Sequence, residues 1–138
     1  MLPLTIPRRR LTIAIDGVDG SGKSSLARFL SWQLDMPAIE ADMYLMGNGL
    51  MPRYDFLKLR ELIHEWHQLN QPVIVESLFV LQLLRDINVK PDCLIRVNRV
   101  GHTGSNRWQK SYANYLAEFP RANVPDHTLT WRQQITPT

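Results

Sequence analysis

The sequence predicts a three-layer α/β fold, with a parallel sheet of about five strands and helices on both faces. Three observations carry this prediction. Short apolar segments typical of buried strands alternate with longer segments that have apolar residues at helical spacing. A glycine-rich loop joins the first strand pattern to the first helix pattern. Acidic residues follow the strand patterns, and they would meet at the carboxyl edge of a parallel sheet, where ligands usually bind.

Strand patterns recur along the whole chain. Residues 11–15 are almost continuously apolar and branched, which is typical of a central parallel strand covered on both sides. Residues 72–75 have the same character. The other candidates are residues 37–41, residues 93–97 and a weak edge strand over residues 127–131.

Helical spacing appears between these strand patterns. In residues 23–34, leucines recur every four positions and form one stripe, and residues 56–69 carry a similar apolar face that Asp55 can cap. Residues 79–87 and 106–119 are the other helix candidates. In the last one, aromatic residues recur at helical spacing, which is more typical of a core than of a nucleobase platform. Residues 43–53 contain glycine and proline and are expected to form a loop.

Composition limits the class of protein. With 138 residues, the chain is expected to form one domain over residues 1–138. No apolar run is long enough to cross a bilayer, and no export signal is recognisable, so we expect a cytoplasmic protein. Its single cysteine excludes an intrachain disulfide framework. The net charge of +3 suits a small anionic ligand and does not indicate specific nucleic acid binding.

Residues 17–24, with the sequence GVDGSGKS, match the pattern G-x-x-x-x-G-K-[ST] in full. Glycines let successive backbone N–H groups turn inward as an anion nest, and the following helix adds its positive dipole end. Lys23 is expected to reach the β- and γ-phosphates of a nucleoside triphosphate, and the Ser24 hydroxyl to ligate Mg²⁺. Asp19 is expected to face the solvent within the loop. The residues predicted to bind the nucleotide are Gly17, Asp19, Gly20, Ser21, Gly22, Lys23, Ser24 and Ser25.

Residues 13–27, IAIDGVDGSGKSSLA, resemble the opening of the uridine kinase-like branch of the P-loop kinases. Nucleoside monophosphate kinases, including thymidylate kinase, open in a similar way. Two further segments support the resemblance: EADMY at residues 40–44, like the D-x-[FY] motif of the family, and PVIVES at residues 72–77, like its strand ending in Glu-Gly. The resemblance covers roughly residues 10–100. It implies a P-loop NTPase fold, ATP and Mg²⁺, and transfer of the γ-phosphate to a hydroxyl group.

The resemblance also implies roles for residues near the strand ends. Asp42 is the candidate base or orienting acceptor for the hydroxyl, although it could instead be a capping or solvated carboxylate. Glu76 would hold a water bound to Mg²⁺, or the acceptor, unless it pairs with a basic residue. Asp16 could also organise such waters. Tyr44 is a candidate substrate contact, and Arg53 would bind the phosphate of a monophosphate acceptor if it is not simply part of a polar surface.

A lid over residues 99–110 would supply cations that neutralise charge on the transferring phosphoryl group. Arg107 is our candidate because it begins the last predicted helix, although the regular lid arginines of the family are not matched well. Three functions therefore stay open: a nucleoside-like kinase, a nucleoside monophosphate kinase, and a nucleotide-binding module without kinase activity. The partner in the first case is a small-molecule acceptor, and a homodimer is compatible with the sequence.

Overall fold

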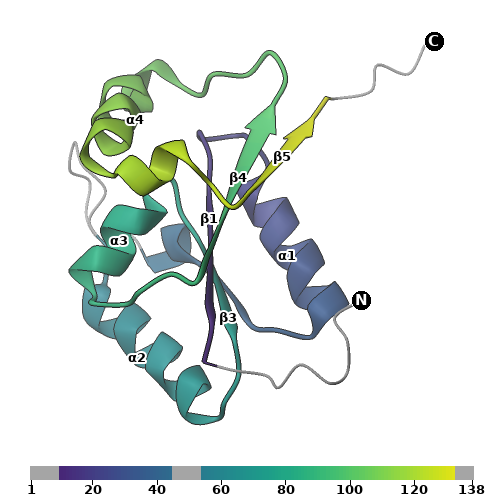
Figure 1. Ribbon diagram of the computed structural model, residues 1–138, viewed down its shortest axis with the longest axis vertical. Coiled ribbons are helices and arrows are strands. Elements are labelled where there is room, and N and C mark those ends of the chain that lie inside the picture. The colour runs from purple at the N-terminus through teal and green to yellow at the C-terminus, as the bar shows by residue number, and fades with distance from the viewer. Residues whose placement is uncertain (1–9, 45–53, 133–138) are drawn as a thin grey trace.

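A computed structural model of the chain describes residues 10–44 and 54–132 (Figure 1). Its sheet has five strands in the order β2-β3-β1-β4-β5, and every neighbouring pair is parallel. The strands are β1 (Thr12–Asp16), β2 (Ala38–Glu40), β3 (Val73–Glu76), β4 (Cys93–Arg99) and β5 (His127–Trp131). The predicted parallel sheet is therefore confirmed, including its weak edge strand.

Helices cover both faces of this sheet, as predicted. Figure 1 shows helices on the right and on the left of the sheet. They are α1 (Lys23–Leu34) on the right, and α2 (Phe56–Gln68), α3 (Val80–Asp86) and α4 (Asn106–Glu118) on the left. Two short 3₁₀ helices, η1 (Ala41–Tyr44) and η2 (Pro120–Asn123), were not expected from the sequence. The predicted loop over residues 43–53 thus begins within η1, and residues 45–53 lie outside the described residues.

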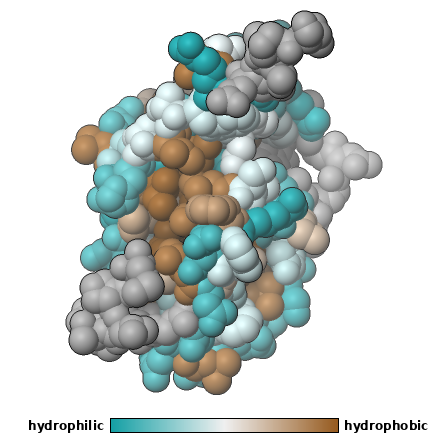
Figure 2. Space-filling model, turned by 90° about the vertical axis from the view of Figure 1, so that its right-hand side faces the viewer, coloured by the Kyte–Doolittle hydropathy of each residue, from teal (hydrophilic) through white to brown (hydrophobic). Residues whose placement is uncertain are grey.

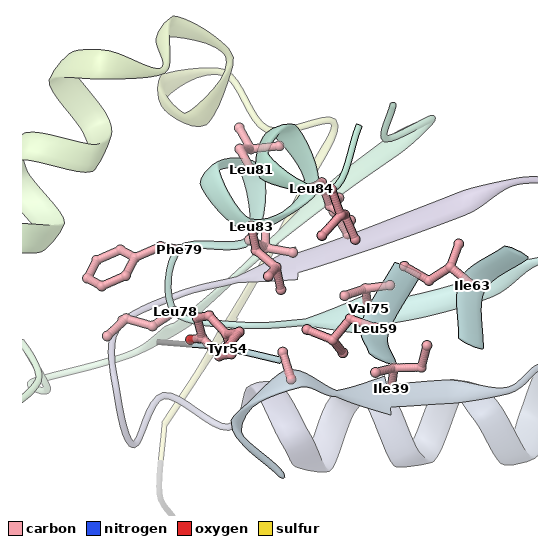
Figure 3. Close-up of a cluster of buried hydrophobic side chains, with 14 of the residues drawn as sticks. Ile39, Tyr54, Leu59, Ile63, Val75, Leu78, Phe79, Leu81, Leu83 and Leu84 are labelled. Atoms are coloured by element: carbon pink, nitrogen blue, oxygen red, sulfur yellow. The ribbon is translucent and has the colours of Figure 1, made fainter. Parts of the chain in front are cut away.

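The larger hydrophobic core lies between the sheet and the helices α2, α3 and α4 (Figure 3). Strand side chains alternate between faces, so Ala14, Val75 and Leu94 point into this core. Helix α2 contributes Leu59 and Ile63, which repeat at helical spacing and are at most 1% exposed. Burial of this stripe fixes α2 against β3.

The smaller core lies between the sheet and α1. It contains Ile15, Ile74 and Val97 from the strands, and within the described residues α1 is the only helix that packs against it. Figure 2 shows hydrophobic side chains gathered on this side of the molecule, and Leu129 on β5 is 44% exposed. Helix α1 thus covers the β2, β3 and β1 part of this face more fully than the β4 and β5 part.

Strand register brings the candidate site together. Glu76 at the end of β3 pairs with Ile15 on β1 and with Glu40 on β2, so three strand ends meet at one edge. The loop between β1 and α1 leaves the sheet at this same edge. No helix in the described part of the chain is long and apolar enough to cross a membrane.

Candidate active site

The loop over residues 17–22 turns directly from β1 into α1. Gly17 has a φ angle of 146°, and a Cβ atom there would lie 2.5 Å from the carbonyl oxygen of Val97 on β4. A side chain at this position would therefore push the loop away from the sheet. Gly22 caps α1 in the left-handed conformation and offers no side chain to the helix. The first backbone N–H groups of α1 therefore lack a side-chain cap and suit an anion.

Lys23, the first residue of α1, is buried, with 7% of its surface exposed. Its ammonium group donates a hydrogen bond of 3.0 Å to the carbonyl oxygen of Val18, within the same loop. Burial lowers the pKa of Lys23, although the nearby carboxylates of Glu76, Asp42 and Asp19 oppose this shift. The loop therefore holds its lysine folded back onto the Val18 carbonyl, beside a group of acids.

Glu76 lies beside the next residue of α1. The Ser24 hydroxyl donates a hydrogen bond of 2.9 Å to Oε1 of Glu76. Glu76 is 1% exposed, and its Oε2 atom is buried without a partner among the described residues. Burial raises the pKa of Glu76 above its ordinary value, and the charge of Asp42 adds to this. A hydroxyl and an unsatisfied carboxylate oxygen are the oxygen ligands that suit Mg²⁺ or its bound waters.

Asp42 lies in η1, just beyond β2, and belongs to a polar group that the sequence did not reveal. The Tyr54 hydroxyl lies 3.5 Å from Oδ1 of Asp42 and 3.0 Å from the hydroxyl oxygen of Ser77. Burial, with a smaller contribution from the charge of Asp42, raises the pKa of Tyr54 to about 12, so this hydroxyl stays protonated. Tyr54 belongs to no short motif, and Ser77, although it ends the PVIVES segment, was given no role of its own by the sequence.

These groups line one cavity of about 460 Å³, a size that accommodates a small ligand. The loop and α1 contribute one wall, the ends of β2 and β3 another, and aromatic residues from α4 and β5 close the rest. The lining residues are Asp19, Gly20, Gly22, Lys23, Ser24, Ser25, Asp42, Tyr54, Glu76, Leu78, Trp108 and Trp131. The structure therefore brings most of the predicted site residues together.

Some predicted residues do not line the cavity. Ser21 is completely buried, and its carbonyl oxygen accepts a hydrogen bond of 2.6 Å from the indole nitrogen of Trp131. Tyr44 packs against the larger core. The guanidinium of Arg107 lies 4.7 Å from the ring of Trp108, which itself lines the cavity. Arg53 lies outside the described residues.

Comparison with solved structures agrees with this architecture. A possible uridine kinase from Bacillus stearothermophilus superposes with a TM-score of 0.59 at 16% identity, over 88% of this chain and 89% of that one. A gluconokinase from Sinorhizobium meliloti 1021 superposes with a TM-score of 0.54 at 20% identity, over 91% of this chain and 83% of that one. A thymidylate kinase from Ehrlichia chaffeensis superposes with a TM-score of 0.52 at 14% identity, over 93% of this chain and 89% of that one. The chain has the P-loop kinase fold. No protein-family model and no curated protein matches the sequence.

Within this P-loop kinase fold, Asp16 has a structural position. It is completely buried, and its two carboxylate oxygens accept hydrogen bonds of 2.7 and 2.8 Å from Arg96 on β4. The Tyr115 hydroxyl on α4 donates a third, of 2.8 Å. The prediction that Asp16 organises waters around Mg²⁺ is therefore wrong, because Arg96 and Tyr115 occupy its carboxylate on the face of the sheet away from α1. These partners are 80 and 99 residues away in sequence, which hid them from motif analysis.

Asp19, expected to face the solvent, is half-buried and also has a structural partner that the sequence did not indicate. Both of its carboxylate oxygens accept a hydrogen bond from the backbone N–H of Ser105, each at 3.0 Å. Ser105 precedes α4 and lies within the predicted lid over residues 99–110. In the structure this predicted lid consists of the end of β4, a connection over residues 100–105 and the first turn of α4. The loop over residues 17–22 thus contacts this predicted lid segment directly.

Proposed function

We propose that the protein is an ATP-dependent kinase that transfers the γ-phosphate to a hydroxyl group of a small molecule, most like a nucleoside. One observation carries this proposal. The glycine-rich loop and its buried Lys23 open into the same cavity as Asp42 and Glu76, which come from neighbouring strand ends. A group that binds phosphates and a carboxylate that accepts a proton are the parts that phosphoryl transfer to an alcohol requires.

The loop would bind the triphosphate. Its backbone N–H groups and the start of α1 attract the anion, and Lys23 would exchange its bond to Val18 for one to a β- or γ-phosphate oxygen. Ser24 and Glu76 would hold Mg²⁺, directly and through water, since the unsatisfied Oε2 atom of Glu76 fits that task. When bound, the ion would neutralise charge on the phosphates.

Asp42 would act on the acceptor. The acceptor oxygen forms a bond to the γ-phosphorus as the bond from that phosphorus to the bridging oxygen of ADP breaks, and the hydroxyl proton passes to the carboxylate of Asp42. Tyr54 and Ser77 would keep this carboxylate oriented through the contacts of the Tyr54 hydroxyl. Arg107 stays our candidate for stabilising charge on the transferring group, from its position beside Trp108.

The charges in the cavity favour an uncharged acceptor. Among the described lining residues the only cation is Lys23, while Asp19, Asp42 and Glu76 are acidic. The phosphate group of a monophosphate acceptor would lie beside these carboxylates without a cation to pair with it, unless Arg53 supplies one. Tyr54, Leu78 and Trp108 add apolar surface suited to a nucleobase or sugar. These features support a nucleoside-like acceptor over a monophosphate, and Tyr44 stays a candidate contact.

A panel of acceptors tests the proposal. ADP release from Mg²⁺-ATP is measured with uridine and other nucleosides, with sugars and gluconate, and with UMP and dTMP. We expect at least one uncharged alcohol to stimulate ADP release far above the background without acceptor. Preference for UMP or dTMP would support a nucleoside monophosphate kinase instead. No stimulation by any acceptor, with ATP still bound, would support a nucleotide-binding module without kinase activity.

We further propose a cytoplasmic location, because ATP and Mg²⁺ are available there and the only cysteine is Cys93. The proposed reaction needs neither nucleic acid nor a membrane. A homodimer stays open, and sedimentation equilibrium at micromolar concentration tests it.

A further inference from the structure

Asp19 joins the phosphate loop to the start of α4. Its carboxylate accepts the backbone N–H of Ser105 at 3.0 Å through both oxygens, across 86 residues of sequence. Ser105 is the N-cap of α4, and its own hydroxyl makes no capping hydrogen bond. An acidic group at this position satisfies a free N–H group and interacts favourably with the positive end of the helix dipole. Asp19 therefore caps α4 from outside the helix.

A second contact strengthens this connection. The carbonyl oxygen of Asp19 lies 2.7 Å from Nε2 of His102, so the main chain and the side chain of Asp19 both hold the segment over residues 102–105. The two segments are in close contact at their glycines. A Cβ atom on Gly20 would lie 2.6 Å from Nε2 of His102, and one on Gly104 would lie 2.6 Å from Oδ1 of Asp19. The backbone of each segment thus packs directly against side chains of the other.

This connection determines where the first turn of α4 lies. Trp108 in that turn lines the candidate active site, and Arg107 stacks against the Trp108 ring. Loss of the cap would release the end of α4 that carries both residues. Partial burial alone would raise the pKa of Asp19, but the hydrogen bonds from Ser105 outweigh it and lower the pKa, so the carboxylate is charged at neutral pH.

We propose that Asp19 is a positioning residue, whose carboxylate caps α4 and holds Arg107 and Trp108 against the cavity. Because the same loop would bind the phosphates, Asp19 couples phosphate binding to the position of the lid segment. The structural part of this proposal is independent of catalysis, and its kinetic part rests on the proposed kinase function.

Hydrogen exchange of the whole protein tests the structural part without any substrate. We expect Asp19→Ala to speed amide exchange in a peptide covering residues 103–108 by about five- to tenfold, the effect of a lost helix cap. Exchange in β1 should stay unchanged, as should exchange everywhere in the control variant Glu65→Ala, which removes an exposed acid from α2. Unchanged exchange at residues 103–108 in Asp19→Ala would overturn the proposal.

A second variant removes the donor instead of the acceptor. Ser105 has a φ angle of −75°, so Ser105→Pro deletes the N–H group at a φ angle that proline adopts. If the Asp19 contact is the cap, Asp19→Ala, Ser105→Pro and the double variant should speed exchange from residue 106 onward equally. Fully additive effects would show that Asp19 acts elsewhere and would overturn the proposal.

Kinetics then tests the positioning role. We expect Asp19→Ala to lower kcat more than it weakens ATP binding, and Asp19→Glu to restore part of kcat. A loss of ATP affinity without any change in kcat would assign Asp19 to phosphate binding and overturn the positioning role. If no acceptor supports turnover in the wild type, the proposed function fails, whereas the exchange experiment still decides the contact between Asp19 and Ser105.

Discussion

The Ser24 hydroxyl and Oε1 of Glu76 form a hydrogen bond of 2.9 Å that joins the start of α1 to the end of β3. The other carboxylate oxygen of Glu76 is buried and has no partner among the described residues. A buried carboxylate in this condition destabilises the fold, because its charge is desolvated without full compensation. A bound cation would remove that penalty, and this is the physical reason to connect Glu76 with Mg²⁺.

The first prediction therefore separates stability from activity at Glu76. Because the folded protein raises the pKa of Glu76, the folded state binds its proton more tightly than the unfolded state does. Above the pKa of Glu76 in the folded protein, ionisation of this side chain lowers the free energy of unfolding. This destabilisation vanishes below the pKa of glutamate in the unfolded chain, about 4.3. Glu76→Gln should therefore raise the free energy of unfolding at pH 7 by about 1 kcal/mol and leave it unchanged at pH 4. The same variant should abolish turnover that depends on Mg²⁺. Urea denaturation without metal at both pH values would disprove this account if the variant were less stable at pH 7.

Lys23 provides the second prediction. Lys23→Met keeps the volume of the side chain but removes the ammonium group that the loop holds beside Val18. We expect ATP affinity to fall at least tenfold, about 1.4 kcal/mol, while the fold is retained. Isothermal titration with a non-hydrolysable ATP analogue measures this. Lys58→Met, on an exposed position of α2, is the matched control and should bind the analogue as the wild type does. Equal affinity in both variants would remove Lys23 from the phosphate site.

Tyr54 provides the third prediction. Tyr54→Phe removes the hydroxyl that contacts Asp42 and Ser77 but keeps the buried ring. We expect kcat to fall by about tenfold, since a positioning contact is lost and the carboxylate itself remains. ATP affinity should not change, because among the described residues the Tyr54 hydroxyl contacts Asp42 and Ser77 and no residue of the loop. Steady-state kinetics with varied acceptor checks this, and an unchanged kcat would show that Asp42 needs no support from Tyr54.

The buried pair of Asp16 and Arg96 provides the fourth prediction. Arg96→Met leaves the completely buried Asp16 without its bidentate partner, which should lower the free energy of unfolding by about 3–5 kcal/mol. The double variant Asp16→Leu with Arg96→Met removes both charges and should recover part of this loss. Chemical denaturation of the three proteins tests the assignment. A single variant as stable as the wild type would contradict a structural role for this pair.

Local patterns predicted most of the fold. The strands and helices follow from periodicity and branching, and the helix at residues 23–34 matches α1 in both of its ends. The strand predicted at residues 93–97 proved longer, because Asn98 and Arg99 continue pairing with Thr130 and Trp131 on β5. Polar residues in this extension carry no apolar signal, so only the partner strand determines where β4 ends.

The candidate site was predictable where it depends on a contiguous motif. The loop over residues 17–24 needs particular residue types at fixed spacing, so its sequence identifies it. Contacts between distant segments could not be predicted, as Trp131 shows: it binds the carbonyl oxygen of Ser21 from 110 residues away. Asp16, next to the motif, and Asp19, inside it, show the same limit, since their hydrogen-bond partners Tyr115 and Ser105 lie 99 and 86 residues away.

One comparison tests the central claim most directly: acceptor-dependent ADP release by the wild type and by Asp42→Asn, with ATP binding measured in parallel. The Asn side chain keeps the shape of Asp42 and the contact with Tyr54 but cannot accept a proton in the same way. For a small-molecule kinase with Asp42 as its base, we expect turnover to fall by at least about 10²-fold while ATP binding is retained. Equal turnover in the two proteins, or a wild type that binds ATP and phosphorylates no acceptor, would contradict the claim.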